Sequence, residues 1–97
     1  MTQREQAELL RRIQEAILNG RYVVTPHALL EMRNDALDLI DVESAILTGR
    51  IETVFDDDPR GRRFEVVGKA CDLTTEVSVL VRFAGPVLII TVYVKSP

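Results

Sequence analysis

Apolar residues recur at helical spacing over the first half of the chain and at every second position over the second half. The first pattern predicts three helices, at about residues 3–19, 26–36 and 39–48. A residue whose side chain can bond the free amides of a helix start precedes each of them, namely Thr2, Thr25 and Asp38. The helices are therefore predicted from two independent signals.

The alternating pattern begins at residue 50 and predicts four strands, at about residues 50–56, 62–68, 76–83 and 87–94. Turn-forming segments separate the strands, and a short extended connector at residues 21–24 joins the first two helices. Since the strands follow one another without intervening helices, we expect a single α+β domain over residues 1–97. In this fold three N-terminal helices pack on one face of a four-stranded antiparallel sheet.

The last two predicted strands are joined around Gly85 and Pro86. A two-residue loop at these positions places Arg82 opposite Ile89 and brings the apolar residues of both strands to one face. A slip of one residue would turn every side chain over, so we expect this register. The residues of the predicted apolar face are Val77, Val79, Val81, Phe83, Leu88, Ile90, Val92 and Val94.

The opposite face of the predicted sheet is polar. Its residues are Arg63, Glu65, Lys69, Ser78, Arg82, Thr91, Tyr93 and Lys95. One interpretation is a solvated surface with cross-strand ion pairs, such as Glu65 with Arg82. The other is a basic and aromatic patch that holds phosphate and stacks a nucleic-acid base. The pattern alone favours the first, because alternation by itself predicts polar residues on an exposed face.

The chain has 97 residues, a formal net charge of −3 and a single cysteine. These values exclude a disulfide framework and a surface that is basic throughout, so nucleic-acid binding would need a local patch. No apolar run reaches the roughly 18 residues that a membrane-spanning helix requires. The first residues also lack the apolar core of a secretory signal. We therefore expect a cytoplasmic protein without membrane contact.

His27 is the only histidine, so any acid–base chemistry that needs an imidazole must use this residue. It falls in the first turn of the second predicted helix, four residues before Glu31. A polar contact that orients the helix is the commoner use of such a residue. Without a second histidine or a cysteine cluster, we expect neither a metal ion nor another cofactor. Cys71 is expected to be a packed or free thiol.

Several short motifs follow one another in a recognisable order: His27-Ala28 with Met32, Asp41-Val42, Gly49, and the closing residues Ile90, Thr91, Val92 and Tyr93. In this order of motifs the chain resembles the small bacterial domain-of-unknown-function family four-two-five-eight. The resemblance implies a fold like that of RelE toxins, an RNA-cleaving ancestry and a zinc-finger antitoxin of the MqsA type as partner. Where that family usually has arginines in the second helix, this chain has Glu31 and Asp35, which weakens attraction for a phosphodiester backbone.

Two functions are consistent with these observations. The first is a RelE-like toxin of a toxin–antitoxin pair, a metal-independent ribonuclease or RNA-binding protein with its site on the polar sheet face. Such cleavage needs a base, cationic stabilisation of the phosphate and a proton for the leaving oxygen. The predicted catalytic residues are His27, Arg82 and Tyr93, and the predicted substrate-binding residues are Arg63, Thr91 and Lys95. The alternative is a non-catalytic interaction module that forms a homodimer or binds an antitoxin-like protein.

Overall fold

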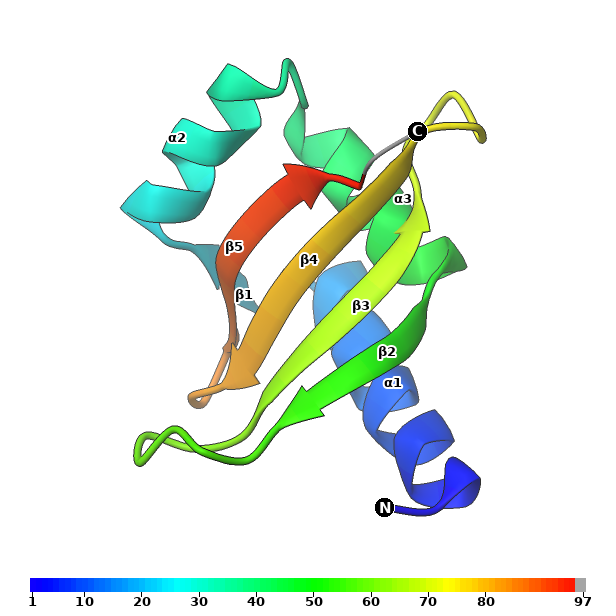
Figure 1. Ribbon diagram of the computed structural model, residues 1–97, viewed down its shortest axis with the longest axis vertical. Coiled ribbons are helices and arrows are strands. Elements are labelled where there is room, and N and C mark those ends of the chain that lie inside the picture. Colours follow the sequence, from blue (N-terminus) through cyan, green and yellow to red (C-terminus); the bar gives the residue numbers. More distant parts are fainter. Residues whose placement is uncertain (96–97) are drawn as a thin grey trace.

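A computed structural model describes residues 1–95, which form three helices and one five-stranded sheet (Figure 1). The helices are α1 (Gln3–Leu18), α2 (Pro26–Asn34) and α3 (Leu39–Thr48). The strands are β1 (Tyr22–Val24), β2 (Arg50–Phe55), β3 (Arg63–Lys69), β4 (Glu76–Phe83) and β5 (Val87–Val94). Across the sheet they lie in the order β1-β5-β4-β3-β2.

The helix starts follow the local sequence signals. The Thr2 hydroxyl accepts a hydrogen bond from the Glu5 amide at 3.1 Å, and the Glu5 carboxylate accepts one from the Thr2 amide at 3.2 Å. At the start of α2, the Thr25 hydroxyl accepts a hydrogen bond from the Ala28 amide at 3.2 Å. These side chains satisfy amides that have no partner within the helix, so the predicted caps of α1 and α2 are confirmed.

The prediction of a four-stranded antiparallel sheet is wrong, because the sheet is mixed and has a fifth strand. Tyr22–Val24, expected to be a connector, pairs in parallel with residues 87–89 at the start of β5. The other neighbouring strands are antiparallel. A three-residue segment between two helices carries too little pattern to predict a strand, and its partner lies at the far end of the sequence.

The prediction that all three helices pack on one face of the sheet is also wrong. α1 and α3 lie behind the sheet in Figure 1, where α3 packs on β3 and β4, whereas α2 lies beside β5 at the edge of the antiparallel strands. The opposite sheet face, which is towards the viewer in Figure 1, is not covered by any helix of residues 1–95. We call it the open face.

The hydrophobic core lies between the sheet and the helices behind it. Its fully buried large side chains include Ile13, Val42, Ile46, Phe64, Val66, Val77, Val79, Val81, Ile89 and Val92. The rings of Phe64 and Phe83 meet edge to face, with their centroids 5.8 Å apart. Because full burial of each large apolar side chain contributes about 1.5–3 kcal/mol, this layer supplies most of the stabilisation.

β4 and β5 pair in a register that differs from the predicted one. Arg82 lies opposite Leu88 rather than Ile89, so three residues, not two, form the loop. Ile90 has no partner on β4, which marks a β-bulge. The extra residue reverses the alternation along β5, so Ile89 is buried in the core while Leu88 lies on the open face beside Arg82. The expected core positions of Leu88 and Ile90 are therefore wrong, and that of Val92, beyond the bulge, is confirmed.

The outer edge of β5 is bonded by two different elements. β1 pairs with it only as far as Ile89. Beyond this point the Val92 amide donates to a carboxylate oxygen of Glu31 at 3.1 Å, and the Val94 amide donates to Asp35 at 2.9 Å. Side chains four residues apart on a helix are about 6 Å apart along its axis, close to the roughly 6.6 Å between alternate strand amides. α2 therefore takes the place of a further strand along this edge.

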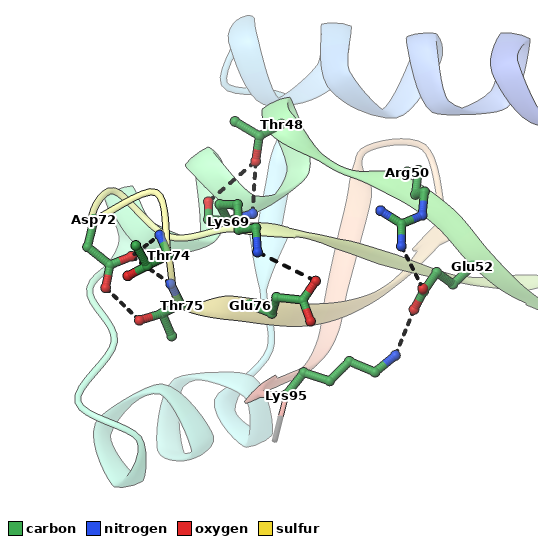
Figure 2. Close-up of polar contacts among 9 residues, drawn as sticks. All are labelled: Thr48, Arg50, Glu52, Lys69, Asp72, Thr74, Thr75, Glu76 and Lys95. Carbon is green, nitrogen blue, oxygen red and sulfur yellow. Dashed lines mark hydrogen bonds and ion pairs between the residues drawn. The ribbon is translucent and has the colours of Figure 1, made fainter. Parts of the chain in front are cut away.

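α3 approaches β3 closely at Gly68. A Cβ atom on Gly68 would lie 1.8 Å from the backbone oxygen of Ala45. Just beyond it, the Lys69 amide donates to the Thr48 hydroxyl at 2.9 Å (Figure 2), and the Ser44 hydroxyl donates to the Lys69 carbonyl at 2.9 Å. The end of β3 is thus bonded directly to a helix, and only glycine fits between them.

Gly68→Ala is expected to lower the free energy of unfolding by at least about 2–3 kcal/mol, because the new methyl group overlaps a backbone atom. Chemical denaturation followed by circular dichroism measures the change. The double variant with Ala45→Gly does not recover the loss, since the clash is with the carbonyl oxygen and not with the Ala45 side chain. Recovery in the double variant would contradict this packing.

Glu31→Ala and Asp35→Ala are each expected to lower the free energy of unfolding by about 1–3 kcal/mol, because each leaves a strand amide without a charged acceptor. Hydrogen exchange followed by NMR gives the specific readout. The Val92 amide exchanges faster in Glu31→Ala, and the Val94 amide does so in Asp35→Ala. Asn34→Ala, at an exposed position of the same helix, is the control. If both amides kept their wild-type exchange rates, α2 would not bond the edge as described.

Candidate functional site

The open face carries a cavity of about 190 Å³. It is lined by side chains from all four antiparallel strands, namely Phe55, Glu65, Ser78, Leu80, Thr91 and Tyr93. Strand alternation places these residues here, because their neighbours Phe64, Val66, Val79 and Val92 point into the core. The cavity therefore combines aromatic and aliphatic walls with a carboxylate and three hydroxyl groups.

Glu65 is the centre of the polar network in this cavity. Its carboxylate accepts hydrogen bonds from the hydroxyls of Thr53 at 2.8 Å, Ser78 at 2.7 Å and Tyr93 at 3.2 Å. The Lys95 ammonium lies 3.7 Å from the same carboxylate. Partial burial raises the pKa of Glu65, but the hydrogen bonds and Lys95 outweigh it and hold the pKa below its ordinary value. The group is therefore a carboxylate anion at neutral pH.

Two arginines lie directly opposite each other at one end of the open face, Arg63 on β3 and Arg82 on β4. The Arg63 guanidinium lies 3.2 Å from Asp57, 3.6 Å from Asp58 and 5.1 Å from the centroid of the Phe55 ring. Arg82 instead donates to the backbone oxygen of Arg60, in the loop between β2 and β3, at 3.4 Å and forms no ion pair within the described residues. Facing another cation without a carboxylate of its own, Arg82 is available to an anionic ligand.

The other cations of the open face are neutralised, as Figure 2 shows for its opposite end. The Lys95 ammonium lies 2.7 Å from Glu52, which also pairs with Arg50 at 3.0 Å. Lys69 lies 3.7 Å from Glu76. The basic patch expected from the sequence is therefore much smaller than the number of its basic residues indicates, and its unpaired charge is at Arg82.

The predicted site residues divide into two groups. Thr91 and Tyr93 line the cavity, Arg63 and Arg82 lie at one end of the same face, and Lys95 reaches the cavity carboxylate. The predicted ion pair of Glu65 with Arg82 is absent from the described residues, because Glu65 lies opposite Leu80 instead.

His27 lies apart from this group. It is on α2 with an exposed side chain, and its Nε2 atom is 3.3 Å from the Glu31 carboxylate, which bonds the edge of β5. It does not line the cavity. This contact lies within α2 itself, and a catalytic role for His27 stays a prediction.

Sequence reasoning missed two residues as members of the site. The sequence predicts Glu65 only as a partner of Arg82, and it predicts Phe55 only as part of a strand. Alternation is the signal that would have included both. Glu65 lies two residues from Arg63 on the same face of β3, and Phe55 of β2 pairs with Arg63.

Other groups of the described chain are less suited to chemistry. Cys71 is a free, exposed thiol whose pKa is raised by desolvation and by the nearby Asp41 carboxylate, so it is not an activated nucleophile. Among residues 1–95, no group of three or more histidine, cysteine, aspartate or glutamate side chains is placed to hold a metal ion. No helix in this part of the chain is long and apolar enough to cross a membrane.

Acidification is expected to weaken the fold, and Glu65 and Asp72 are two of the carboxyl groups that contribute to the loss. A carboxyl whose pKa is lower in the folded state contributes stability above its unfolded pKa and loses it as the pH falls through the folded pKa. For Glu65 the loss begins below the ordinary pKa of 4.5. For Asp72, whose pKa is lowered to about 2 by hydrogen bonds from Thr75 and Thr74 (Figure 2), it extends from pH 3.8 to about 2.

Urea unfolding at a series of pH values measures both contributions. Glu65→Gln is expected to reduce the fall in the free energy of unfolding just below pH 4.5. Asp72→Asn is expected to reduce the fall between pH 3.8 and about 2. Each variant serves as the control for the other, and identical curves for the wild type and both variants would contradict the assigned pKa shifts.

Comparison with known protein families gives a match over most of the chain. Residues 24–94, from the end of β1 to the end of β5, match a family described as a domain of unknown function, DUF4258. No curated protein and no solved structure matches the chain. The matched segment includes α2, α3 and every strand that lines the open face, and the chain belongs to the DUF4258 family.

Proposed function

We propose that the open face binds single-stranded RNA and cleaves it without a metal ion. The observation that carries this proposal is the unpaired guanidinium of Arg82, at the end of the sheet face whose cavity holds Glu65 and Tyr93. An unpaired cation supports phosphate binding, an aromatic ring supports base stacking, and an ionised carboxylate supports proton transfer.

The arrangement of these groups supports a division of roles along the face. A phosphate at Arg82 places the adjoining ribose and base over the cavity, where Phe55 and Tyr93 offer surfaces for stacking. Thr91 lines the same cavity and can bond a base edge. Arg63 adds positive charge opposite Arg82. In this proposal Arg82 and Tyr93 are catalytic residues, and Arg63 and Thr91 bind the substrate.

The proposed reaction is an attack of the ribose 2′-oxygen on the neighbouring phosphorus. Glu65 takes the 2′-hydroxyl proton, a bond forms between the 2′-oxygen and phosphorus, and the bond from phosphorus to the 5′-oxygen breaks. Tyr93 gives its hydroxyl proton to the leaving 5′-oxygen and regains one from Glu65, to which it is hydrogen-bonded at 3.2 Å. The proton count balances, and Lys95 acts as a positioning residue for Glu65.

The resemblance to RelE-like toxins supports a cellular setting for this activity. We infer that the protein is the toxin of a toxin–antitoxin pair that acts on RNA in the cytoplasm. An antitoxin-like protein of the zinc-finger MqsA type is the partner that the resemblance implies. RNA cleavage of this kind is consistent with an acidic protein, because one local cationic site can contact the phosphate.

A non-catalytic interaction module is the second candidate function. It is favoured by the neutralised cations of the open face and by apolar side chains that α2 and α3 leave exposed. Leu30 is 55% exposed and Ile40 is 61% exposed. Exposed apolar side chains of this size are typical of surfaces that bind another protein or a second copy.

The two functions differ in an RNA cleavage assay with purified protein in excess chelator. Arg82→Ala, Tyr93→Phe and Glu65→Gln are each expected to slow cleavage by at least about 100-fold, because each removes a group that acts in the transition state. Arg33→Ala, an exposed arginine on α2, is the control and keeps the wild-type rate. Circular dichroism verifies that each variant is folded.

Induction in a bacterial host gives the matching result in cells. Wild-type protein slows growth and shortens messenger RNA, and the Arg82→Ala/Tyr93→Phe double variant does neither. If the wild-type protein neither cuts RNA nor binds it at low salt, the proposed activity is refuted and the interaction module is favoured.

A further inference from the structure

A second cavity, of about 610 Å³, lies at the end of the sheet near the β4–β5 loop. Its walls come from the C-terminal half of α1, the start of β1 and the loop itself. Phe83 lines it from the core side of β4, opposite to the open face on which Arg82 lies. The cavity is therefore separate from the one that holds Glu65.

Two arginines line this cavity, Arg12 on α1 and Arg21 before β1. Neither forms an ion pair with a carboxylate within the described residues, although the chain as a whole has more acidic than basic residues. Glu15 also lines the cavity, but its carboxylate is already paired with Arg11. The lining is thus left with two unneutralised guanidinium groups.

The surrounding fold holds the side chain of Arg12 and the backbone of Arg21 in place. The Arg12 guanidinium lies 4.5 Å from the centroid of the Phe83 ring, a cation–π contact that restricts the side chain while leaving its N–H groups free. The Arg21 backbone is bonded at both ends: its amide donates to Ala16 at 2.8 Å, and its carbonyl accepts from Val87 at 3.1 Å. Because these groups are already restricted, they lose less side-chain and backbone entropy when a ligand binds.

Two glycines leave room at the rim of the cavity. Gly20 and Gly85 both line it and have φ values of +69° and +78°, a backbone region that glycine adopts without strain. A Cβ atom on either would meet no heavy atom within 4 Å, so the space beside them is open. A ligand group can approach the arginines from this side.

We propose that this cavity binds a phosphate group through Arg12 and Arg21. A phosphate carries the charge and the several acceptor oxygens that two guanidinium forks satisfy together, whereas a single carboxylate offers fewer of both. The phosphate belongs either to a free phosphorylated compound or to a second segment of an RNA strand, and the chemistry of recognition is the same. The site does not depend on cleavage at the open face.

The test is an NMR titration of the full chain with inorganic pyrophosphate, with acetate as the comparison ligand. Binding is expected to shift the amide signals of Arg21 and Gly85 first. Arg12→Gln and Arg21→Gln are each expected to weaken binding by at least about tenfold, because each removes a charged hydrogen-bond donor. Arg33→Gln, at an exposed arginine outside the cavity, changes the affinity less than twofold.

Further variants separate this site from the open face and identify the source of the phosphate. Arg82→Ala leaves pyrophosphate binding unchanged, even if it abolishes RNA cleavage. If an RNA oligonucleotide competes with pyrophosphate, the site is assigned to RNA. If RNA does not compete and adenosine monophosphate binds more tightly than inorganic phosphate, the site is assigned to a free nucleotide. Both results support the proposal. Signal shifts at Arg82 without shifts at Arg21 and Gly85, equal affinity for acetate, or unchanged binding in both glutamine variants would overturn it.

Discussion

The hydrogen bonding along the outer edge of β5 determines how the rest of the molecule is arranged. A strand in the interior of a sheet needs partners for its amides and carbonyls on both sides. β4 provides them on one side. On the other side β1 bonds the first half of β5, while Glu31 of α2 and Asp35, directly after the end of α2, bond the second half. Because α2 is used in this way, it lies beside the sheet and not over it, which leaves the open face accessible.

This arrangement gives several acidic residues of the chain a structural role. Glu31 and Asp35 look unfavourable for binding RNA when they are counted as surface charge. In the structure their oxygens are acceptors for strand amides, and Glu65 is likewise an acceptor for three hydroxyl groups. These hydrogen bonds leave the carboxylates negatively charged, but they explain why the fold has acidic residues at these positions: an ionised acceptor forms a stronger hydrogen bond than a neutral one.

The basic side chains differ in whether a carboxylate pairs with them. Most basic side chains of the open face are paired with carboxylates, whereas Arg82 on that face and Arg12 and Arg21 behind it are not. All three lie near the loop between β4 and β5, whereas Arg4 on α1 and Arg33 on α2, which also form no ion pair within residues 1–95, lie elsewhere. The shared location of Arg12, Arg21 and Arg82 connects the proposed RNA site with the proposed phosphate site, although different strand faces hold them.

The sequence by itself predicts those features that depend only on interactions between residues close together in the chain. Caps at Thr2 and Thr25, the apolar stripes of the helices and the alternation in β3 and β4 depend on residues within a few positions of one another, so the sequence predicts them directly. The same alternation places Arg63, Arg82, Thr91 and Tyr93 on one face.

What the sequence could not decide depends on distant partners: the parallel pairing of Tyr22–Val24, the bulge at Ile90, and the carboxylates that neutralise the open face. Their energies come from contacts between segments far apart in the chain, so only the tertiary structure shows which cations remain free to bind a ligand.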